Sequence, residues 1–332
     1  MPKLICIGFA FPHHKNTNAG YHHLVDYLHY DKVIICQKEI EESQKSIRSN
    51  YKNIFKICFY RFKFNVGITI KCIFYNLLYK DCIFHFIYGE NTYKMLKTFL
   101  RKTNKVVCTF HQPFSWFDND VWQKRLKQLD GIILMSSDEI IKFQQAAPNA
   151  KVIFIPHGVN TDFYYNDNIY SRKKQVIMVG NWLRDFEFAN RVFSKLIEID
   201  KSINIVIVTN KSNFIYFTEN SSVKLLSGIS DIKLRDLYRQ SSCLFLPLTI
   251  YTANNAILEA LAVDCPIIIA TNKPSTSYFN KSIVSIIPMD ESDAVNNIIS
   301  AFSKRVYSRE FVVNNYSWPV VAKKTEKFLN NL

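Results

Sequence analysis

The chain has 332 residues, of which 48% are hydrophobic and 21% are charged. This balance is typical of a folded globular protein, and the eight glycines and ten prolines exclude collagen-like and low-complexity sequence. The formal net charge of +14 predicts anionic partners: a nucleotide phosphate, a nucleic acid or an anionic membrane surface.

The cysteines and the N-terminal sequence indicate a cellular compartment. None of the eight cysteines forms a CxxC pair, so the local signature of a zinc or thioredoxin-type site is missing, and most of them lie in apolar runs. The first residues show no signal peptide, and no apolar stretch approaches the roughly 20 residues that span a bilayer. We therefore expect a cytoplasmic protein, with the inner face of the cytoplasmic membrane as a place of peripheral contact.

The first half alternates between short apolar runs and longer segments of helical period, which is typical of βαβ units with a parallel sheet. Strands are predicted at residues 3–9, 32–36, 82–88, 105–110, 131–135 and 152–155. Helices are predicted at residues 20–29, 43–79 with a break at 65–67, 91–102, 119–129 and 137–145.

The second half repeats this alternation. Strands are predicted at residues 175–179, 203–208, 223–226, 243–247, 266–270 and 283–287, with helices at 185–199, 231–240, 253–263 and 290–303. A helical tail interrupted at Pro319 follows. The pattern predicts two doubly wound α/β domains joined near residues 157–174, with ligand bound in a cleft at the carboxyl ends of both sheets.

The join begins with the run PHGVN at residues 156–160, directly after an apolar strand. This run resembles the "PxGVD" hinge of glycosyltransferase family 4, whose members have the GT-B fold. The resemblance implies an acceptor domain at 1–160, a nucleotide-sugar domain at 161–310, and a tail at 311–332 that packs back on the first domain. For His157 itself, we favour a capping or packing role at the linker.

Three segments of the second half match the parts of that family that bind a nucleotide-sugar. In VGNWLRD, Asn181 stands where the family commonly has an arginine, and Arg184 is the cation available to neutralise the donor diphosphate. The alternative role for Arg184 is a surface ion pair with Asp185 or Glu187. The segment LLSGIS places Gly228 and Ile229 where the family packs a loop on the nucleotide base.

The third segment, TANNAILEALA, enters a helix whose N-terminus suits a phosphate. Asn254 and Asn255 are good capping residues there. Glu259 matches the family's helix glutamate, which bonds the ribose, whereas Thr252 replaces a glutamate that contacts the donor sugar. The alternative for Glu259 is an exposed position on the helix surface.

Two further segments lie in the first half. Gly20 follows the loop FAFPHHKNTNA, where the family reaches the donor phosphates, and His111 follows the strand VVCTF, where the family places a histidine beside the transferring sugar. The alternative for His111 is a core histidine. His13, His14, His22 and His23 form no metal-ligand pattern, because adjacent histidines point in different directions and no carboxylate lies among them.

Residues 43–80 contain eight basic residues, nine aromatic residues and no acidic residue. This mixture favours contact with an anionic membrane. Single-stranded nucleic acid is the less favoured partner, and a third alternative is that the rings face the core while the cations are solvated.

The resemblance implies a glycosyltransferase that moves a sugar from a UDP- or GDP-type donor to a hydroxyl of a glycan, with a lipid-linked acceptor, retention of configuration and no metal. Catalytic roles fall to His111, Arg184 and Glu259. Two alternatives stay open: a sugar-nucleotide epimerase or hydrolase on the same fold, and an inactive scaffold that binds a membrane or nucleic acid, suggested by Thr252 and Asn181.

Overall fold

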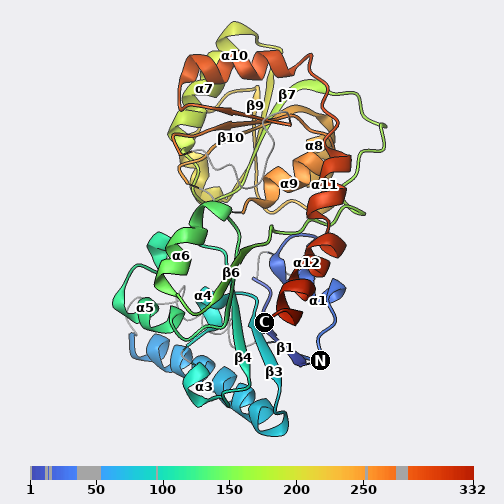
Figure 1. Cartoon of the computed structure of the whole chain (residues 1–332). Coiled ribbons are helices and arrows are strands. Elements are labelled where there is room, and N and C mark those ends of the chain that lie inside the picture. The colour runs from blue at the N-terminus through green and yellow to red at the C-terminus, as the bar shows by residue number, and fades with distance from the viewer. Residues whose placement is uncertain are drawn as a thin grey trace. The chain divides into compact units, whose positions relative to one another are not determined.

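The computed structural model describes residues 2–11, 14, 17–35, 54–94, 96–250, 253–273 and 283–332; of residues 35 and 54–65 it describes the backbone only. The chain forms two compact units, one of Met1–His157 with Val321–Leu332 and one of Gly158–Val320 (Figure 1). The boundary between the two units thus follows His157, whereas the sequence predicted it after residue 160. The tail is shared between the units instead of forming a segment of its own.

The first unit contains a six-stranded sheet in which all neighbouring strands are parallel. Its order is β2 (Lys32–Ile35), β1 (Lys3–Gly8), β3 (Cys82–Phe86), β4 (Lys105–Phe110), β5 (Gly131–Leu134) and β6 (Lys151–Phe154). These strands confirm the six predicted in the first half. Most are continuous apolar runs, because helices cover both faces of a doubly wound parallel sheet.

The helices of this unit differ from the prediction at two places. They are α1 (Leu24–Tyr27), α3 (Ile54–Leu78), α4 (Gly89–Thr92), α5 (Asp120–Leu126), α6 (Ile140–Ala146) and most of α12 (Trp318–Asn330). The predicted break at 65–67 is wrong, since α3 is continuous there: a helix tolerates Asn65 and Gly67 at a modest cost when no proline is present. Residues 91–102 do not form one helix, because α4 ends at Thr92 and only a short 3-10 helix, Leu96–Phe99, follows.

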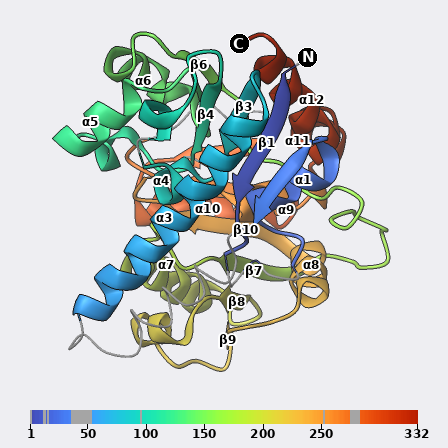
Figure 2. The ribbon, with the colours of Figure 1, turned by 90° about the horizontal axis from the view of Figure 1, so that it is seen from below.

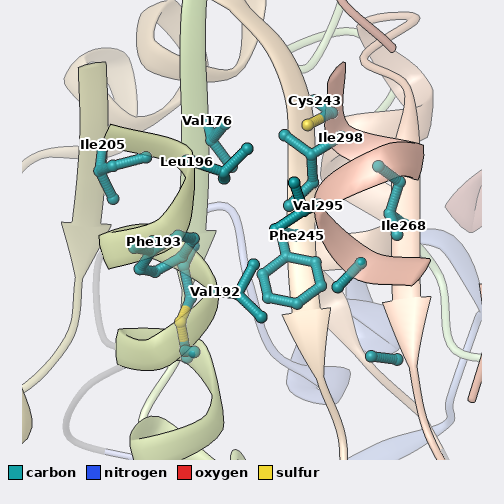
Figure 3. Close-up of a cluster of buried hydrophobic side chains, with 14 of the residues drawn as sticks. Val176, Val192, Phe193, Leu196, Ile205, Cys243, Phe245, Ile268, Val295 and Ile298 are labelled. Atoms are coloured by element: carbon teal, nitrogen blue, oxygen red, sulfur yellow. The ribbon is translucent and has the colours of Figure 1, made fainter. Parts of the chain in front are cut away.

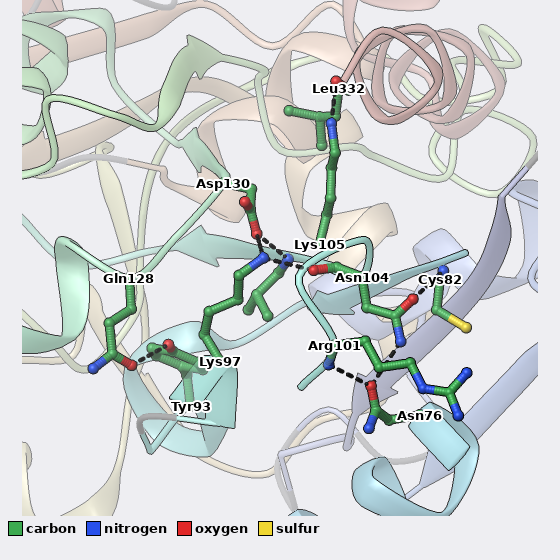
Figure 4. A network of polar contacts seen from close by, with 11 residues as sticks. Asn76, Cys82, Tyr93, Lys97, Arg101, Asn104, Lys105, Gln128, Asp130 and Leu332 are labelled. Atoms are coloured by element: carbon green, nitrogen blue, oxygen red, sulfur yellow. Dashed lines mark hydrogen bonds and ion pairs between the residues drawn. The ribbon is translucent and has the colours of Figure 1, made fainter. Parts of the chain in front are cut away.

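A buried polar network ties α3 to the sheet (Figure 4). The Asn104 side chain accepts a hydrogen bond from the Cys82 backbone N–H at 2.9 Å and donates one to Asn76 Oδ1 of α3 at 2.7 Å. Lys97 Nζ donates to Asp130 Oδ2 at 2.7 Å, and the same oxygen accepts from the Val106 N–H. Backbone groups at the amino ends of β3 and β4 are thereby satisfied without water.

The second unit contains a second parallel sheet, which confirms the other six predicted strands. Its order is β12 (Val284–Ile287), β11 (Ile267–Ala270), β10 (Ser241–Pro247), β7 (Lys173–Val179), β8 (Asn204–Val208) and β9 (Val223–Leu226). The helices are α7 (Phe186–Ile199), α8 (Asp231–Gln240), α9 (Asn255–Ala262), α10 (Glu291–Ala301) and α11 (Arg309–Tyr316).

The core of this unit lies between one face of the sheet and the pair α7 and α10 (Figure 3). Alternate residues of the strands, such as Cys243 and Phe245, meet Phe193 of α7 and Ile298 of α10. The other helices α8, α9 and α11 lie away from this pair, as Figure 1 and the view of Figure 2 show.

The tail contains two helices, as the sequence allowed, but Pro319 does not separate them. The break falls at Ser317, and Pro319 is the second residue of α12. Proline is tolerated in the first turn because the N–H that it lacks has no partner inside the helix.

Candidate functional site

The order of the second sheet points to a ligand site. The chain passes from β7 outward to β8 and later returns to β10 on the other side of β7, so the direction of winding reverses between β7 and β10. Open α/β sheets bind ligands outside the carboxyl ends of the strands at such a point. The loop after β7 carries Arg184, which forms a backbone bridge with Leu248 directly after β10.

The Arg184 guanidinium is held by neutral oxygens. Its Nε and Nη2 donate to the Val179 carbonyl at 3.3 and 3.1 Å, and Nη1 donates to the Trp182 carbonyl at 2.5 Å. Gly180, whose φ is +117°, makes room for it, because a Cβ at that position would lie 2.5 Å from Arg184 Nη2. The loop after β7 therefore wraps around the Arg184 side chain, and Gly180 makes this conformation possible.

Arg184 has no acidic partner among the ion pairs found in the described residues. Of the two suggested partners, Asp185 caps α7 by accepting from the Phe188 N–H at 2.8 Å, and Glu187 is exposed in the first turn of α7. Desolvation lowers the pKa of the half-buried Arg184 to about 10, so the group stays charged at neutral pH. A positive charge with only neutral partners favours a bound anion at this point.

The N-terminus of α9 meets the same arginine. Asn254 is the N-cap residue, but its side chain does not cap the helix; its Oδ1 accepts from Arg184 Nη2 at 3.3 Å. The expected capping role of the Asn254 side chain is thus wrong, because the arginine takes the oxygen that a cap would use. Asn255 is the first residue of α9. The structure brings Arg184, Asn254 and Asn255 together, as one phosphate would require.

Glu259 lies in α9 and is 4% exposed, which contradicts the alternative of an exposed helix position. Its Oε2 accepts a hydrogen bond from the Tyr238 hydroxyl of α8 at 3.1 Å. Burial raises the pKa of Glu259 to about 7, and the phenol of Tyr238 opposes that rise by hydrogen bonding to the carboxylate. The side chain of Tyr164 also acts to lower the pKa of this carboxyl.

Three more of the predicted donor residues, Asn181, Gly228 and Ile229, occupy loops of the same unit. Asn181 Oδ1 accepts from Thr209 Oγ1 at 3.0 Å and from the Asn210 N–H at 2.6 Å, so it fixes the loop after β7 to the end of β8. Gly228 has φ +67° and is exposed, and Ile229 beside it is half-buried, between β9 and α8. Thr252 and residues 43–53 lie outside the described residues.

The first sheet has its own reversal between β1 and β3, and an aromatic and histidine cluster lies at the carboxyl ends there. His111 follows β4, and its ring lies 4.9 Å from the ring of Tyr21, 4.7 Å from that of Tyr88 and 6.4 Å from that of His157 (centroid distances). His157 is 5% exposed, in line with the predicted packing role. The side chain of His111 is 13% exposed.

The sequence reasoning missed Glu90. This residue lies in α4, and its Oε1 is 3.4 Å from His111 Nδ1. Gly89 allows α4 to approach β4 closely, because a Cβ at residue 89 would lie 2.7 Å from the Cβ of Cys108 in β4. A signal was present: Glu90 is a carboxylate shortly after a buried strand, at the sheet edge where ligands bind.

Gly20 precedes a 3-10 helix, Tyr21–His23, that leads into α1, and it has φ +109°. Of the neighbouring histidines, His23 pairs with Asp26 at 3.0 Å, and burial lowers the pKa of His22 to about 4. His13 lies outside the described residues. Within the described residues, no cluster of three or more histidine, cysteine or acidic side chains has the arrangement of a metal site.

No protein-family model matches the chain, and no curated protein matches it in sequence. Solved structures match over nearly the whole chain at low identity. The N-terminal domain of a Candida albicans trehalose-6-phosphate phosphatase has a TM-score of 0.73 at 12% identity, covering 99% of this chain and 97% of that one. A glycosyltransferase from Rickettsia africae has a TM-score of 0.67 at 14% identity, covering 99% and 98%.

A UDP-forming α,α-trehalose-phosphate synthase from Burkholderia xenovorans, in complex with glucose-6-phosphate, matches with a TM-score of 0.66 at 11% identity, covering 99% of this chain and 100% of that one. Membership of glycosyltransferase family 4 stays a prediction. Two parallel six-stranded sheets and these matches show that the chain has the GT-B fold.

Proposed function

We propose that the chain is a glycosyltransferase that moves a sugar from a nucleotide diphosphate-sugar to a hydroxyl of an acceptor. The observation that carries this proposal is the Arg184 guanidinium, held by neutral oxygens beside Asn254 at the N-terminus of α9. Positive charge at this reversal of the sheet suits a diphosphate and stabilises the negative charge that develops on it as the sugar leaves.

The likeness to enzymes of the same fold supports the class of donor. The Burkholderia protein is named as UDP-forming and holds a sugar phosphate. We infer a UDP- or GDP-type donor whose ribose hydroxyls bond Glu259 and whose base packs on Gly228 and Ile229. In this scheme Arg184 and the N-terminus of α9 neutralise the donor diphosphate, so no metal ion has to supply positive charge. By analogy with family 4, we infer that the configuration at the anomeric carbon is retained.

The test is the release of nucleoside diphosphate from UDP- and GDP-sugars, with and without an acceptor, in buffer containing EDTA. Acceptor candidates are a sugar phosphate and a lipid-linked glycan. We expect release that depends on the acceptor and continues in EDTA. Epimerisation without acceptor would instead identify an epimerase. A melting temperature unchanged by every nucleotide and nucleotide-sugar would identify an inactive scaffold.

The acceptor side includes a surface that suits a membrane. The half of α3 with described side chains buries Ile68 and Cys72 but exposes an apolar stripe: Ile70 (61%), Phe74 (55%), Leu77 (64%) and Leu78 (55%). Lys71 and Lys80, both exposed, flank this stripe. Apolar side chains beside lysines favour the interface of an anionic bilayer, and hence a lipid-linked acceptor. No described helix is long and apolar enough to span the membrane.

Replacing Phe74 and Leu77 together with serine is expected to weaken binding to vesicles that contain phosphatidylglycerol, by roughly tenfold for each apolar side chain lost from the interface. Co-sedimentation measures this binding. Ile141→Ser removes an equally exposed apolar side chain from α6 of the same unit and is expected to leave binding unchanged. Equal losses for both variants would contradict a specific role of the stripe.

A further inference from the structure

We infer that Glu90 is a positioning residue for His111: it holds Nδ1–H of the imidazole and so presents Nε2 as an acceptor for a sugar hydroxyl. This inference rests on the proposed function for the identity of the hydroxyl, whereas the pairing of the two side chains stands on geometry alone. Neither the pairing nor Glu90 was indicated by the sequence motifs.

Glu90 and His111 lie at the same edge of the first sheet. Glu90 and His111 follow the adjacent parallel strands β3 and β4, which pair from Ile83 and Lys105 onward. Both therefore lie at the carboxyl edge of the sheet, and their side chains are 11% and 13% exposed. The separation of 3.4 Å between Oε1 and Nδ1 places a carboxylate at one specific ring nitrogen.

Burying the carboxylate of Glu90 costs free energy of folding. Glu90 Oε2 is buried and makes no hydrogen bond to the residues that the structure describes. A buried carboxylate oxygen in that state destabilises the fold, so packing alone does not account for Glu90. A role in orienting an imidazole does, because an imidazole that donates from Nδ1 to a carboxylate keeps Nε2 unprotonated.

Aromatic rings surround the imidazole of His111. Tyr21 and Tyr88 contact His111 on its faces and edges, with centroid distances of 4.9 and 4.7 Å, and both tyrosines are almost completely buried. His157 lies 6.4 Å away, and His85 is bonded on both nitrogens, by Tyr30 and Thr109. Among these neighbours, Glu90 is the one that places a carboxylate oxygen 3.4 Å from Nδ1, and this negative charge favours the proton on that nitrogen.

The tautomer of His111 is the direct test, and it needs no substrate. Imidazole ¹⁵N shifts of the full chain are recorded near pH 8.5, roughly two units above the ordinary histidine pKa, and the His111 signals are identified by their loss in His111→Asn. We expect the Nδ1-protonated form in the wild type and a shift toward the Nε2-protonated form in Glu90→Ala. Glu90→Leu, which has a similar side-chain volume and no hydrogen-bond acceptor, takes its place if the alanine variant does not fold. An unchanged tautomer overturns the inference.

Kinetics supply a second readout. Glu90→Ala and His111→Ala are each expected to lower kcat by roughly 10- to 100-fold, and the double variant is expected to be no slower than His111→Ala, because residues acting as a unit are not additive. Glu90→Asp is expected to restore part of the rate. Losses that multiply in the double variant overturn the inference, since they would show that Glu90 acts independently of His111.

Glu139→Ala is the matched control. Glu139 is another carboxylate of the same unit with a 15% exposed side chain, and it accepts from the Phe114 N–H at 2.8 Å without contacting the imidazole. It is expected to leave the His111 tautomer unchanged. If the wild type transfers no sugar from any donor, the proposed function fails, while the tautomer experiment still decides whether Glu90 sets the protonation of His111.

Discussion

Replacing Arg184 with alanine is expected to lower kcat/KM for sugar transfer roughly 10²- to 10³-fold. Among the described residues the guanidinium has only neutral partners, so its charge is available to the diphosphate, and its interaction strengthens as the bond to the sugar breaks. Initial rates with a saturating acceptor and a varied donor measure the effect.

Two further variants separate charge from geometry. Arg184→Lys keeps the charge but loses the fork that bonds two oxygens at once, and it is expected to recover only part of the rate. Arg191→Ala is the control, because Arg191 is an exposed arginine of the same unit that pairs with Glu291 at 2.6 Å. Thermal unfolding shows whether each variant is folded. A near-normal rate in folded Arg184→Ala would exclude the assigned role.

Replacing Glu259 with glutamine is expected to make the stability of the second unit less dependent on pH. Burial raises the pKa of Glu259 to about 7, whereas in the unfolded chain its pKa is near 4.5. Between these values the folded state binds the proton and the unfolded state does not, so the free energy of unfolding falls as pH rises toward 7. Between pH 5 and 8 this loss amounts to on the order of 3 kcal/mol, and the glutamine variant lacks it.

Denaturant unfolding at both pH values measures this difference. The wild type is expected to lose stability relative to Glu259→Gln on going from pH 5 to 8, because only the wild type must bury a carboxylate at the higher pH. Glu198→Gln, at an exposed position of α7, is expected to follow the wild type. If wild type and Glu259→Gln show parallel pH profiles, Glu259 is not a buried titrating group in solution.

Much of the architecture was readable from local sequence. Buried parallel strands are continuous apolar runs, and all twelve predicted strands are present. Helix boundaries were less readable. Gly67 lies inside α3, and Pro319 lies in the first turn of α12, where its missing N–H costs no hydrogen bond. Both residue types often end helices, but neither does so here.

The donor residues were partly readable. Arg184 and Glu259 were identified from the resemblance of their segments to glycosyltransferase family 4, but their partners were not. That Asn254 bonds Arg184 instead of capping α9 depends on two loops 70 residues apart in the sequence. Likewise, Tyr238 reaches Glu259 only because α8 and α9 lie side by side. Periodicity describes which face of an element is buried and carries no information on such pairs.

By itself, the sequence determined the number of predicted strands and their positions along the chain, the division into two α/β units and the positive charge of the chain. These properties follow from the composition and succession of local segments. Only the tertiary structure decided that Glu90 lies beside His111 and that Arg184 lacks an acidic partner among the described residues. The first depends on the pairing of β3 with β4, because adjacent parallel strands bring the loops that follow them to one edge of the sheet. The second concerns the reversal between β7 and β10, which brings the Arg184 loop to the N-terminus of α9.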